Sequence, residues 1–145
     1  MRNIHIYICI FIATTQISLS QINLVQNNDI IVIKNETTLG NAWTGGLNFA
    51  QFSNIDLNLD GIQDLFVFDK SGKNGTLNGN KKMPFLFDPL ENKFSYAPEY
   101  INSFPELTDW ALLTDYNQDG KSDIFSSYNS SIKLYTNTST NNLQF

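Results

Sequence analysis

Residues 56–64 read Asp56-Leu57-Asn58-Leu59-Asp60-Gly61-Ile62-Gln63-Asp64, and the same pattern returns as Asp115-Tyr116-Asn117-Gln118-Asp119-Gly120-Lys121-Ser122-Asp123. Both stretches have Asp or Asn at positions 1, 3, 5 and 9 and glycine at position 6. Alternating oxygen side chains before a glycine that permits a positive φ suit a hard cation such as Ca²⁺, to which position 7 would offer only its main-chain carbonyl. A metal-free turn rich in Asp, Asn and Gly is the alternative.

The residues after each stretch exclude an EF-hand and indicate strands. An EF-hand needs a bidentate Glu at position 12, where this chain has Val67 and Ser126. The apolar, aromatic run Leu65–Phe68 predicts a strand after the first loop, and Ile124-Phe125 predicts one more weakly after the second. Because no segment has an apolar period of about 3.6 residues, we expect an all-β chain in which each Asp loop joins two strands.

Composition limits the classes of partner. The chain has 145 residues, 41% of them hydrophobic, which suffices for one domain with a core. Its net charge is −5, and six of its 14 acidic residues lie in the two loops. Bound cations would explain much of this negative charge better than an acidic surface would, and the low pI argues against nucleic acid.

The N-terminal stretch 1–20 predicts a secretory signal peptide. Arg2 gives the positive start, an apolar stretch follows, and the small residues Ser18 and Ser20 precede a cleavage point before Gln21. A membrane anchor is the alternative, and no other segment is apolar enough to span a bilayer. We therefore expect a secreted or cell-surface protein with no membrane span after cleavage.

Cleavage has a chemical consequence. Cys9 and His5 are the only cysteine and histidine, and both lie in the signal peptide. The mature chain would then have no disulfide, thiol nucleophile, histidine base or His/Cys zinc site. Packing must then hold it together, with metal as a candidate further contribution.

The rest of the chain shows further short strand signals. Strands are expected at Ile30–Ile33, Leu47–Ile55, Met83–Phe87, Lys93–Tyr96, Trp110–Thr114, Ile132–Thr136 and Leu143–Phe145. The last two segments are expected to form a hairpin. A long exposed loop is predicted at 69–82 and an irregular link at 97–108.

The two loops define an internal repeat, in which Asp115 corresponds to Asp56 and each later position of the second loop to that of the first. Each unit reads strand, Asp loop, strand, longer loop and hairpin, and four strands per unit at a period of several tens of residues are typical of a propeller blade. We expect a partial β-propeller of about two blades of four-stranded antiparallel sheet. An N-terminal segment with a strand would span 21–40, the first blade 41–108, and a truncated second blade 109–145.

Several phrases around the loops extend the pattern toward a known family. They are Trp43-Thr44-Gly45-Gly46-Leu47-Asn48, Asp64-Leu65-Phe66-Val67-Phe68-Asp69-Lys70-Ser71-Gly72, Tyr96-Ala97-Pro98-Glu99-Tyr100 and Asp109-Trp110-Ala111-Leu112-Leu113. With the paired loops, residues 40–145 resemble the FG-GAP/VCBS repeats of integrin-α-like β-propellers. They look like the N-terminal part of secreted Bacteroidetes proteins that commonly end in a type IX secretion sorting domain.

The resemblance implies two Ca²⁺ sites. The first would comprise Asp56, Asn58, Asp60, the Ile62 carbonyl and Asp64, and the second Asp115, Asn117, Asp119, the Lys121 carbonyl and Asp123. Asn at position 3 stands where Asp is common, which lowers the charge of each site. Such propellers close with about seven blades, so we expect a truncated product or gene fragment that lacks the remaining blades; a genuine two-unit protein is the alternative.

The resemblance implies a non-enzymatic module for cell adhesion or ligand binding, with an unknown protein or polysaccharide ligand. The non-catalytic propeller part of a secreted polysaccharide-degrading enzyme is the alternative. The acids outside the loops form no catalytic motif, and the loops lie too far apart for a dockerin. The aromatics Phe66, Phe68, Phe85, Phe87, Phe94 and Tyr96 are interpreted as core packing rather than a sugar-stacking platform.

Overall fold

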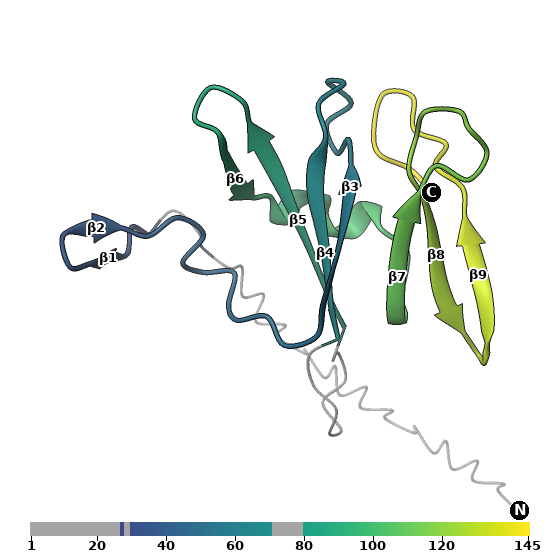
Figure 1. Ribbon diagram of the computed structural model, residues 1–145, viewed down its shortest axis with the longest axis horizontal. Coiled ribbons are helices and arrows are strands. Elements are labelled where there is room, and N and C mark those ends of the chain that lie inside the picture. Colours follow the sequence, from purple (N-terminus) through teal and green to yellow (C-terminus); the bar gives the residue numbers. More distant parts are fainter. Residues whose placement is uncertain (1–26, 28–29, 71–79) are drawn as a thin grey trace, which may run out of the picture.

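A computed structural model describes residues 27, 30–70 and 80–145, so the predicted signal peptide lies outside the described residues. In this part of the chain the regular structure consists of nine strands and one short 3₁₀ helix, η1 (Pro98–Ser103). The strands form three antiparallel sheets, none of them closed (Figure 1). The expectation of an all-β chain is therefore confirmed, and the link predicted at 97–108 contains η1.

The smallest sheet pairs β1 (Ile33–Lys34) with β2 (Thr37–Thr38). The strand predicted at Ile30–Ile33 is wrong over most of its length, because only Ile33 is in a strand. Ile31 and Ile33 are 70% and 65% exposed. No core covers this run, so its β-branched side chains have little to pack against.

The first large sheet is an antiparallel meander of β3 (Ala50–Ile55), β4 (Asp64–Lys70), β5 (Asn80–Asp88) and β6 (Lys93–Tyr96). We call it the first sheet. The loop predicted at 69–82 is shorter than expected, because Asp69 pairs with Lys81 and Lys70 with Asn80. Residues 71–79 of that loop lie outside the described residues.

The second sheet consists of β7 (Thr108–Thr114), β8 (Asp123–Tyr128) and β9 (Ser131–Tyr135) in the same meander order. The strand predicted at Leu143–Phe145 is wrong. Leu143 is buried in the core and the Phe145 ring stacks on Phe104 at 5.5 Å between centroids. Burying these apolar side chains between the sheets removes more apolar area from water than an exposed edge strand would.

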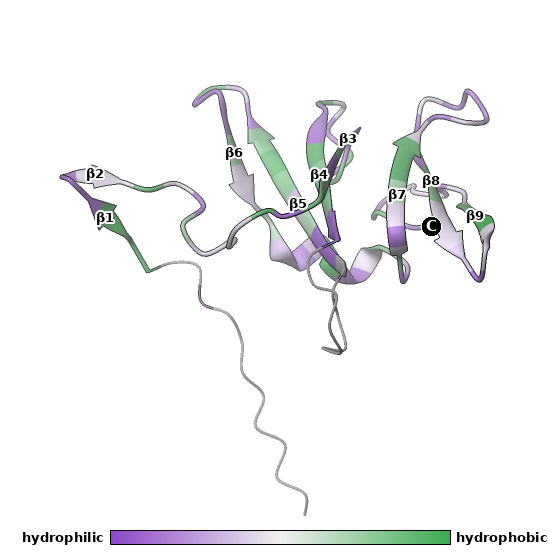
Figure 2. Ribbon diagram, turned by 60° about the horizontal axis from the view of Figure 1, so that its bottom comes forward, coloured by the Kyte–Doolittle hydropathy of each residue, from purple (hydrophilic) through white to green (hydrophobic). Residues whose placement is uncertain are grey.

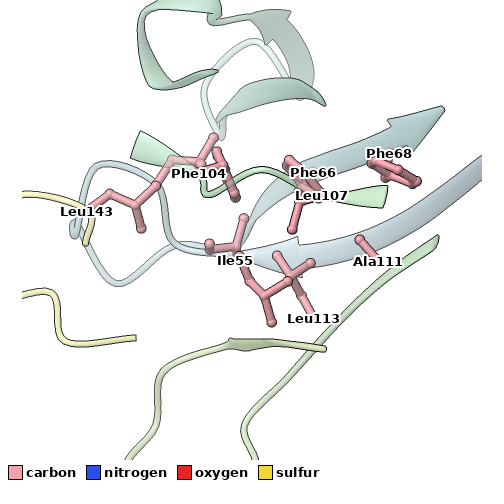
Figure 3. Close-up of a cluster of buried hydrophobic side chains, with 10 residues drawn as sticks. Ile55, Phe66, Phe68, Phe104, Leu107, Ala111, Leu113 and Leu143 are labelled. Carbon is pink, nitrogen blue, oxygen red and sulfur yellow. The ribbon is translucent and has the colours of Figure 1, made fainter. Parts of the chain in front are cut away.

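The core lies where the two large sheets meet. Strands β3 and β7 run side by side (Figure 1). Side chains from both sheets, the link after η1 and the C-terminal segment join in one cluster (Figure 3). Its buried members are Ile55, Leu57, Phe66, Phe68, Phe104, Leu107, Ala111, Leu113, Ile124 and Leu143. Phe66 and Phe104 stack at 4.3 Å within it, so the interpretation of Phe66 and Phe68 as core residues is confirmed. Phe85 is buried in a smaller second cluster, with Tyr96 packed against it. The interpretation is wrong for Phe94, which is 40% exposed on the edge strand β6.

Polar contacts also join β3 to β7. The Gln51 side-chain oxygen accepts the Ala111 N–H at 2.9 Å, and the Ser53 hydroxyl oxygen accepts the Leu113 N–H at 3.3 Å. These side chains satisfy main-chain donors on the edge of β7 that has no neighbouring strand in its own sheet. The two sheets are therefore connected by oriented hydrogen bonds as well as by apolar burial.

At the opposite edge of the first sheet, one side chain forms hydrogen bonds with the main chain of the outermost strand. The Asn41 amide nitrogen donates to the Phe94 carbonyl at 2.8 Å, and its amide oxygen accepts the Tyr96 N–H at 2.8 Å. Phe94 and Tyr96 belong to β6, the outermost strand. One side-chain amide thus takes the donor and acceptor that a further strand would use.

Candidate metal-binding loops

Each Asp loop connects two neighbouring antiparallel strands. The first loop runs from the end of β3 to Asp64, the first residue of β4, and the second runs from the end of β7 to Asp123, the first residue of β8. No helix follows either loop. The predicted strand-to-strand position of both loops is therefore confirmed.

Strand register shows that the repeat is structural. We use "counterpart" for residues of β3, β4, β7, β8 and the loops that are related by the same shift in numbering as Asp56 and Asp115. Ser53 pairs with Phe66 and Asn54 with Leu65 in the first sheet. Their counterparts in the second sheet pair in the same way, Leu112 with Phe125 and Leu113 with Ile124. Phe66 and Phe125 therefore occupy equivalent positions in the two sheets.

The side chains of the first loop turn back onto its own main chain. The Asp56 carboxylate accepts the N–H groups of Asp60 at 3.1 Å and Gly61 at 2.8 Å. Asn58 Oδ1 also accepts the Asp60 N–H at 3.2 Å, and Asp60 Oδ1 accepts the Ile62 N–H at 2.7 Å. Asn58 Nδ2 donates to Asp60 Oδ2 at 2.8 Å. These contacts bring the side chains of positions 1, 3 and 5 together.

The second loop repeats this arrangement. Asp115 accepts the N–H groups of Asp119 and Gly120 at 3.1 and 2.9 Å, and Asp119 accepts that of Lys121 at 2.9 Å. Asn117 contacts Asp119 through its side-chain oxygen and nitrogen at 3.0 Å each. The pattern of residue types therefore specifies one loop conformation twice.

Two residues of each loop have a positive φ. Position 6 is Gly61 at 85° and Gly120 at 86°, as its residue type predicts. Position 4 is Leu59 at 62° and Gln118 at 64°, although neither is a glycine. A left-handed non-glycine residue costs about 1–2 kcal/mol, so the side-chain hydrogen bonds of the loop must offset that cost at position 4.

Position 9 has a role that the sequence pattern does not reveal. Asp64 is 2% exposed, and its carboxylate accepts the Leu57 N–H at 2.9 Å and the Phe87 N–H at 2.8 Å. Leu57 belongs to the loop and Phe87 to β5. One carboxylate thus ties the loop to the third strand of its sheet.

The second loop has the same tie. Asp123 is completely buried and accepts the Tyr116 N–H at 3.1 Å and the Asn137 N–H at 2.8 Å. Asn137 follows β9, the third strand of the meander. Only the loop side of this bond could have been expected from the sequence, because the partner beyond the third strand depends on sheet pairing.

Burial raises the pKa of Asp64 above its ordinary value of 3.8. The N–H groups of Phe87 and Leu57 favour the ionised form and lower the pKa, whereas the nearby charges of Asp60 and Asp56 raise it. Burial is the largest of these causes, and the repulsion by the carboxylates of Asp60 and Asp56 adds to it. A bound cation would reverse the sign of that interaction.

The donor set of each loop fits a hard cation. It offers carboxylate oxygens, one amide oxygen and a main-chain carbonyl, which are the ligand types that Ca²⁺ prefers. A carboxylate oxygen that accepts one N–H still has a lone pair for a metal. Within residues 27, 30–70 and 80–145, no group of three or more His, Cys, Asp or Glu side chains could hold a metal ion. A site here would therefore need Asn58 or Asn117 and the carbonyl of position 7 as well.

A polar groove of about 320 Å³ separates the two loops. Its walls are Asp56, Leu59, Gly61 and Gln63 on one side and Gly120, Lys121, Ser122, Asn137, Ser139 and Thr140 on the other. Lys121 Nζ donates to the Ser139 carbonyl at 2.6 Å. The side chain of position 7 in the second loop thus holds the C-terminal segment beside the loop.

A second hollow, of about 300 Å³, lies beside the outer edge of the first sheet. It is lined by Ile30, Ile31, Thr38, Leu39, Asn41, Ala42, Trp43, Thr44, Ser95 and Tyr96. Trp43 Nε1 donates to the Ile30 carbonyl at 2.7 Å. The indole thus joins two parts of the N-terminal segment.

Asp69 is a buried acid that sequence reasoning did not single out. It is completely buried, and its carboxylate accepts the Asn48 N–H at 3.1 Å and the Phe49 N–H at 2.7 Å. The residue follows the apolar run 65–68, which marks the end of a strand but not a long-range partner. Its role is to hold the segment before β3 across one face of the first sheet.

No protein-family profile, curated protein or solved structure matches this chain. Across the ranges that the structure describes, no helix is long and apolar enough to cross a bilayer.

Proposed function

We propose that this chain is a secreted, non-enzymatic calcium-binding module of β-propeller type that acts in adhesion or ligand binding. The observation that carries the proposal is the duplication of one oxygen-rich loop, with the same hydrogen bonds and the same positive φ angles, at the same place in two sheets. Ordinary turns need not share side-chain oxygens at four positions, whereas two sites for the same ion would.

The residues of each loop would supply different ligand atoms to the ion. Asp56, Asn58 and Asp60 would supply side-chain oxygens, Ile62 its carbonyl, and Asp64 the ninth-position carboxylate; Asp115, Asn117, Asp119, Lys121 and Asp123 would do the same in the second loop. Bound calcium would supply only positive charge and coordination. Because Asp64 and Asp123 also bond to main chain at the third strand, an ion held by these carboxylates would stabilise both sheets.

The expected size of this stabilisation is modest. Extracellular calcium modules bind at about 10⁻⁴–10⁻³ M. At a calcium concentration about ten times the dissociation constant, mass action adds about 1.4 kcal/mol per site. Two such sites would matter in a chain whose mature form is expected to have no disulfide.

The propeller architecture is part of the proposal. The first strands of the two meanders, β3 and β7, lie side by side. The meanders share their pairing register next to the loops, up to the bulge between Thr108 and Ala111, and this supports an arrangement of blades around an axis on the β3 and β7 side. Further blades of the same kind would complete such a ring.

The test is a thermal melt with about tenfold excess of calcium over the expected dissociation constant, compared with a melt in excess EGTA. We expect calcium to raise the wild-type midpoint. The double variant Asp60→Ala/Asp119→Ala should lose most of that increase.

A matched control keeps the result interpretable. Each substitution also removes loop hydrogen bonds, so the calcium-dependent increase is compared, not the absolute midpoint. Glu106→Gln removes one exposed acidic charge outside the loops and should keep the full increase. A wild-type midpoint that ignores EGTA would mean that the loops are turns only.

A further inference from the structure

The second sheet has an uncovered face whose counterpart in the first sheet is buried. Ile55, Phe66 and Phe68 of the first sheet lie in the core against the second sheet. Phe125, the counterpart of completely buried Phe66, is only half-buried. It pairs with Leu112 and Leu134, which are 53% and 36% exposed, and the neighbouring Ile132 is 68% exposed.

We call this surface the open face of the second sheet. It consists of Leu112, Phe125, Ile132 and Leu134 with Tyr116, whose ring meets that of Phe125 edge-on at 5.5 Å. All five are uncharged. Figure 2 shows that parts of the ribbons of β7 and β9 are hydrophobic. A contiguous apolar surface of this kind marks an interaction site more often than chance exposure does.

The first sheet has the complementary surface. Ala111 and Ile124 are the side chains of the second sheet that receive Phe66 and its neighbours. Their counterparts are Phe52 and Leu65, and Phe52 is 61% exposed. We call the corner formed by Phe52, Asn54 and Leu65 the free corner of the first sheet. The chain therefore uses this interface once internally and leaves the open face of the second sheet exposed. On the first sheet Phe52 and Asn54 are exposed, whereas Leu65 is partly buried against a second cluster formed by Val67, Met83 and Phe85.

We propose that a second copy of this chain docks head to tail, with the free corner of its first sheet against the open face of the second sheet. The intrachain contact between the two sheets is the observation that selects this partner. The open face and the free corner are repeat counterparts of the two surfaces that are already in contact inside the chain. The strand register is the same next to the loops, over Phe52–Ile55 and Ala111–Thr114, and a bulge between Thr108 and Ala111 shifts it beyond that point in the second sheet. Pairing two open faces with each other would bring together surfaces that the molecule nowhere joins.

The contact should be weaker than the one inside the chain. The segment held by Asp69 crosses part of the same side of the first sheet, which leaves mainly the free corner accessible. In addition, Gln51 and Ser53, which accept main-chain N–H groups of β7, have Trp110 and Leu112 as counterparts. These side chains cannot repeat the hydrogen bonds, so we expect association that depends on concentration.

A head-to-tail contact joins unlike surfaces, so it continues until the copies close into a ring or form an open chain. Each copy would contribute two sheets. The inference supplies a partner for the propeller architecture proposed above. It does not depend on calcium, because neither surface includes a loop carboxylate.

The test is the molar mass by light scattering across protein concentrations from about 1 µM to about 1 mM, together with two variants. Leu112→Asp charges the open face and Phe52→Asp charges the free corner, both at exposed positions. We expect the wild-type mass to rise to at least twice that of one chain. Each variant alone should remain one chain, and an equal mixture should form pairs, because each variant keeps one intact surface.

Three results would overturn the proposal. One is a wild-type mass of a single chain at every concentration. Another is association that Leu112→Asp abolishes and Phe52→Asp leaves intact, since that indicates two open faces in contact. The third is a mixture that does not associate. Ile33→Asp, at an exposed position of β1, is the control and should associate like the wild type. The calcium-dependent melt, measured on the same variants, reports separately on the function proposed above.

Discussion

The two Asp loops have nearly the same conformation but lie in different surroundings. The bond from the position 6 N–H to the position 1 carboxylate, for example, is 2.8 Å in the first loop and 2.9 Å in the second. In the strands that follow the loops, however, Phe66 is completely buried and Phe125 is only half-buried. The loop conformation is thus set by nearby residue types, whereas the burial of the next strand is set by whatever sheet lies against it. Substitutions in the loops should behave alike, and substitutions in the strands should not.

The largest expected difference concerns the two phenylalanines. Phe66→Ala removes a buried ring that stacks on Phe104, so it should lower the free energy of unfolding by about 3–5 kcal/mol. Phe125→Ala removes a half-buried ring and should cost about 1–2 kcal/mol. Urea denaturation at low protein concentration measures the free energy of unfolding of both variants. Equal losses would contradict the distinction between a covered and an open sheet face.

A smaller and equal effect is expected at position 9 of the loops. Asp64→Ala leaves the Leu57 and Phe87 N–H groups without their acceptor, and Asp123→Ala does the same to Tyr116 and Asn137. Each should cost about 1–3 kcal/mol in the presence of EGTA, partly offset by removal of a buried charge.

Asparagine is the matched control at these positions. Asp64→Asn and Asp123→Asn keep one side-chain oxygen as an acceptor and should cost less than the alanine variants. Chemical denaturation checks all four. A large cost in one loop and none in the other would show that the shared hydrogen bonds do not carry equal weight.

The smallest effect concerns an ion pair between the two large sheets, for which only the first sheet has the lysine. Lys70 Nζ lies 3.0 Å from the Asp109 carboxylate of β7, and the repeat shift places uncharged Asn129, in the turn after β8, at the position of Lys70. The hydrogen bond from Lys70 holds the pKa of Asp109 below its ordinary value of 3.8. A carboxylate with a lowered pKa stabilises the fold above its ordinary pKa and loses that contribution as the pH falls through the lowered value.

Asp109→Asn should therefore lower the melting midpoint slightly at neutral pH and low salt, because both partners are largely exposed. The difference from the wild type should shrink as the pH falls below 3.8. It should also shrink in about 1 M salt at neutral pH. A difference that persists at both extremes would point to packing or to the Ser127 hydroxyl that also contacts Asp109.

The sequence predicts what depends on near neighbours in the chain. The position of both loops between strands, the glycine at a positive φ and the equivalence of Phe66 and Phe125 all follow from residue order. The calcium ligands remain a prediction. The pattern did not show that Asp64 reaches β5, because that contact requires a pairing fixed only when the sheet forms.

Two strand predictions that rested on apolar character alone were wrong, because distant parts of the chain determine how those segments are buried. Ile30–Ile33 looked like a strand, yet most of it lies outside any sheet and is exposed. Leu143–Phe145 looked like a strand, yet it fills the space beside Phe104. In both cases the residue types show that burial would be favourable. The three-dimensional arrangement decides whether these side chains are buried and whether they are in a strand.

Asn41 has a consequence for aggregation. A sheet edge with free main-chain donors and acceptors is a template on which another chain can extend, and uncontrolled extension leads to fibrils. The Asn41 amide occupies the Phe94 carbonyl and the Tyr96 N–H of β6, so an incoming strand would have to displace it first. Growth by strand addition is thereby opposed at this edge, which directs contacts between chains toward sheet faces, where side-chain shape can select the partner.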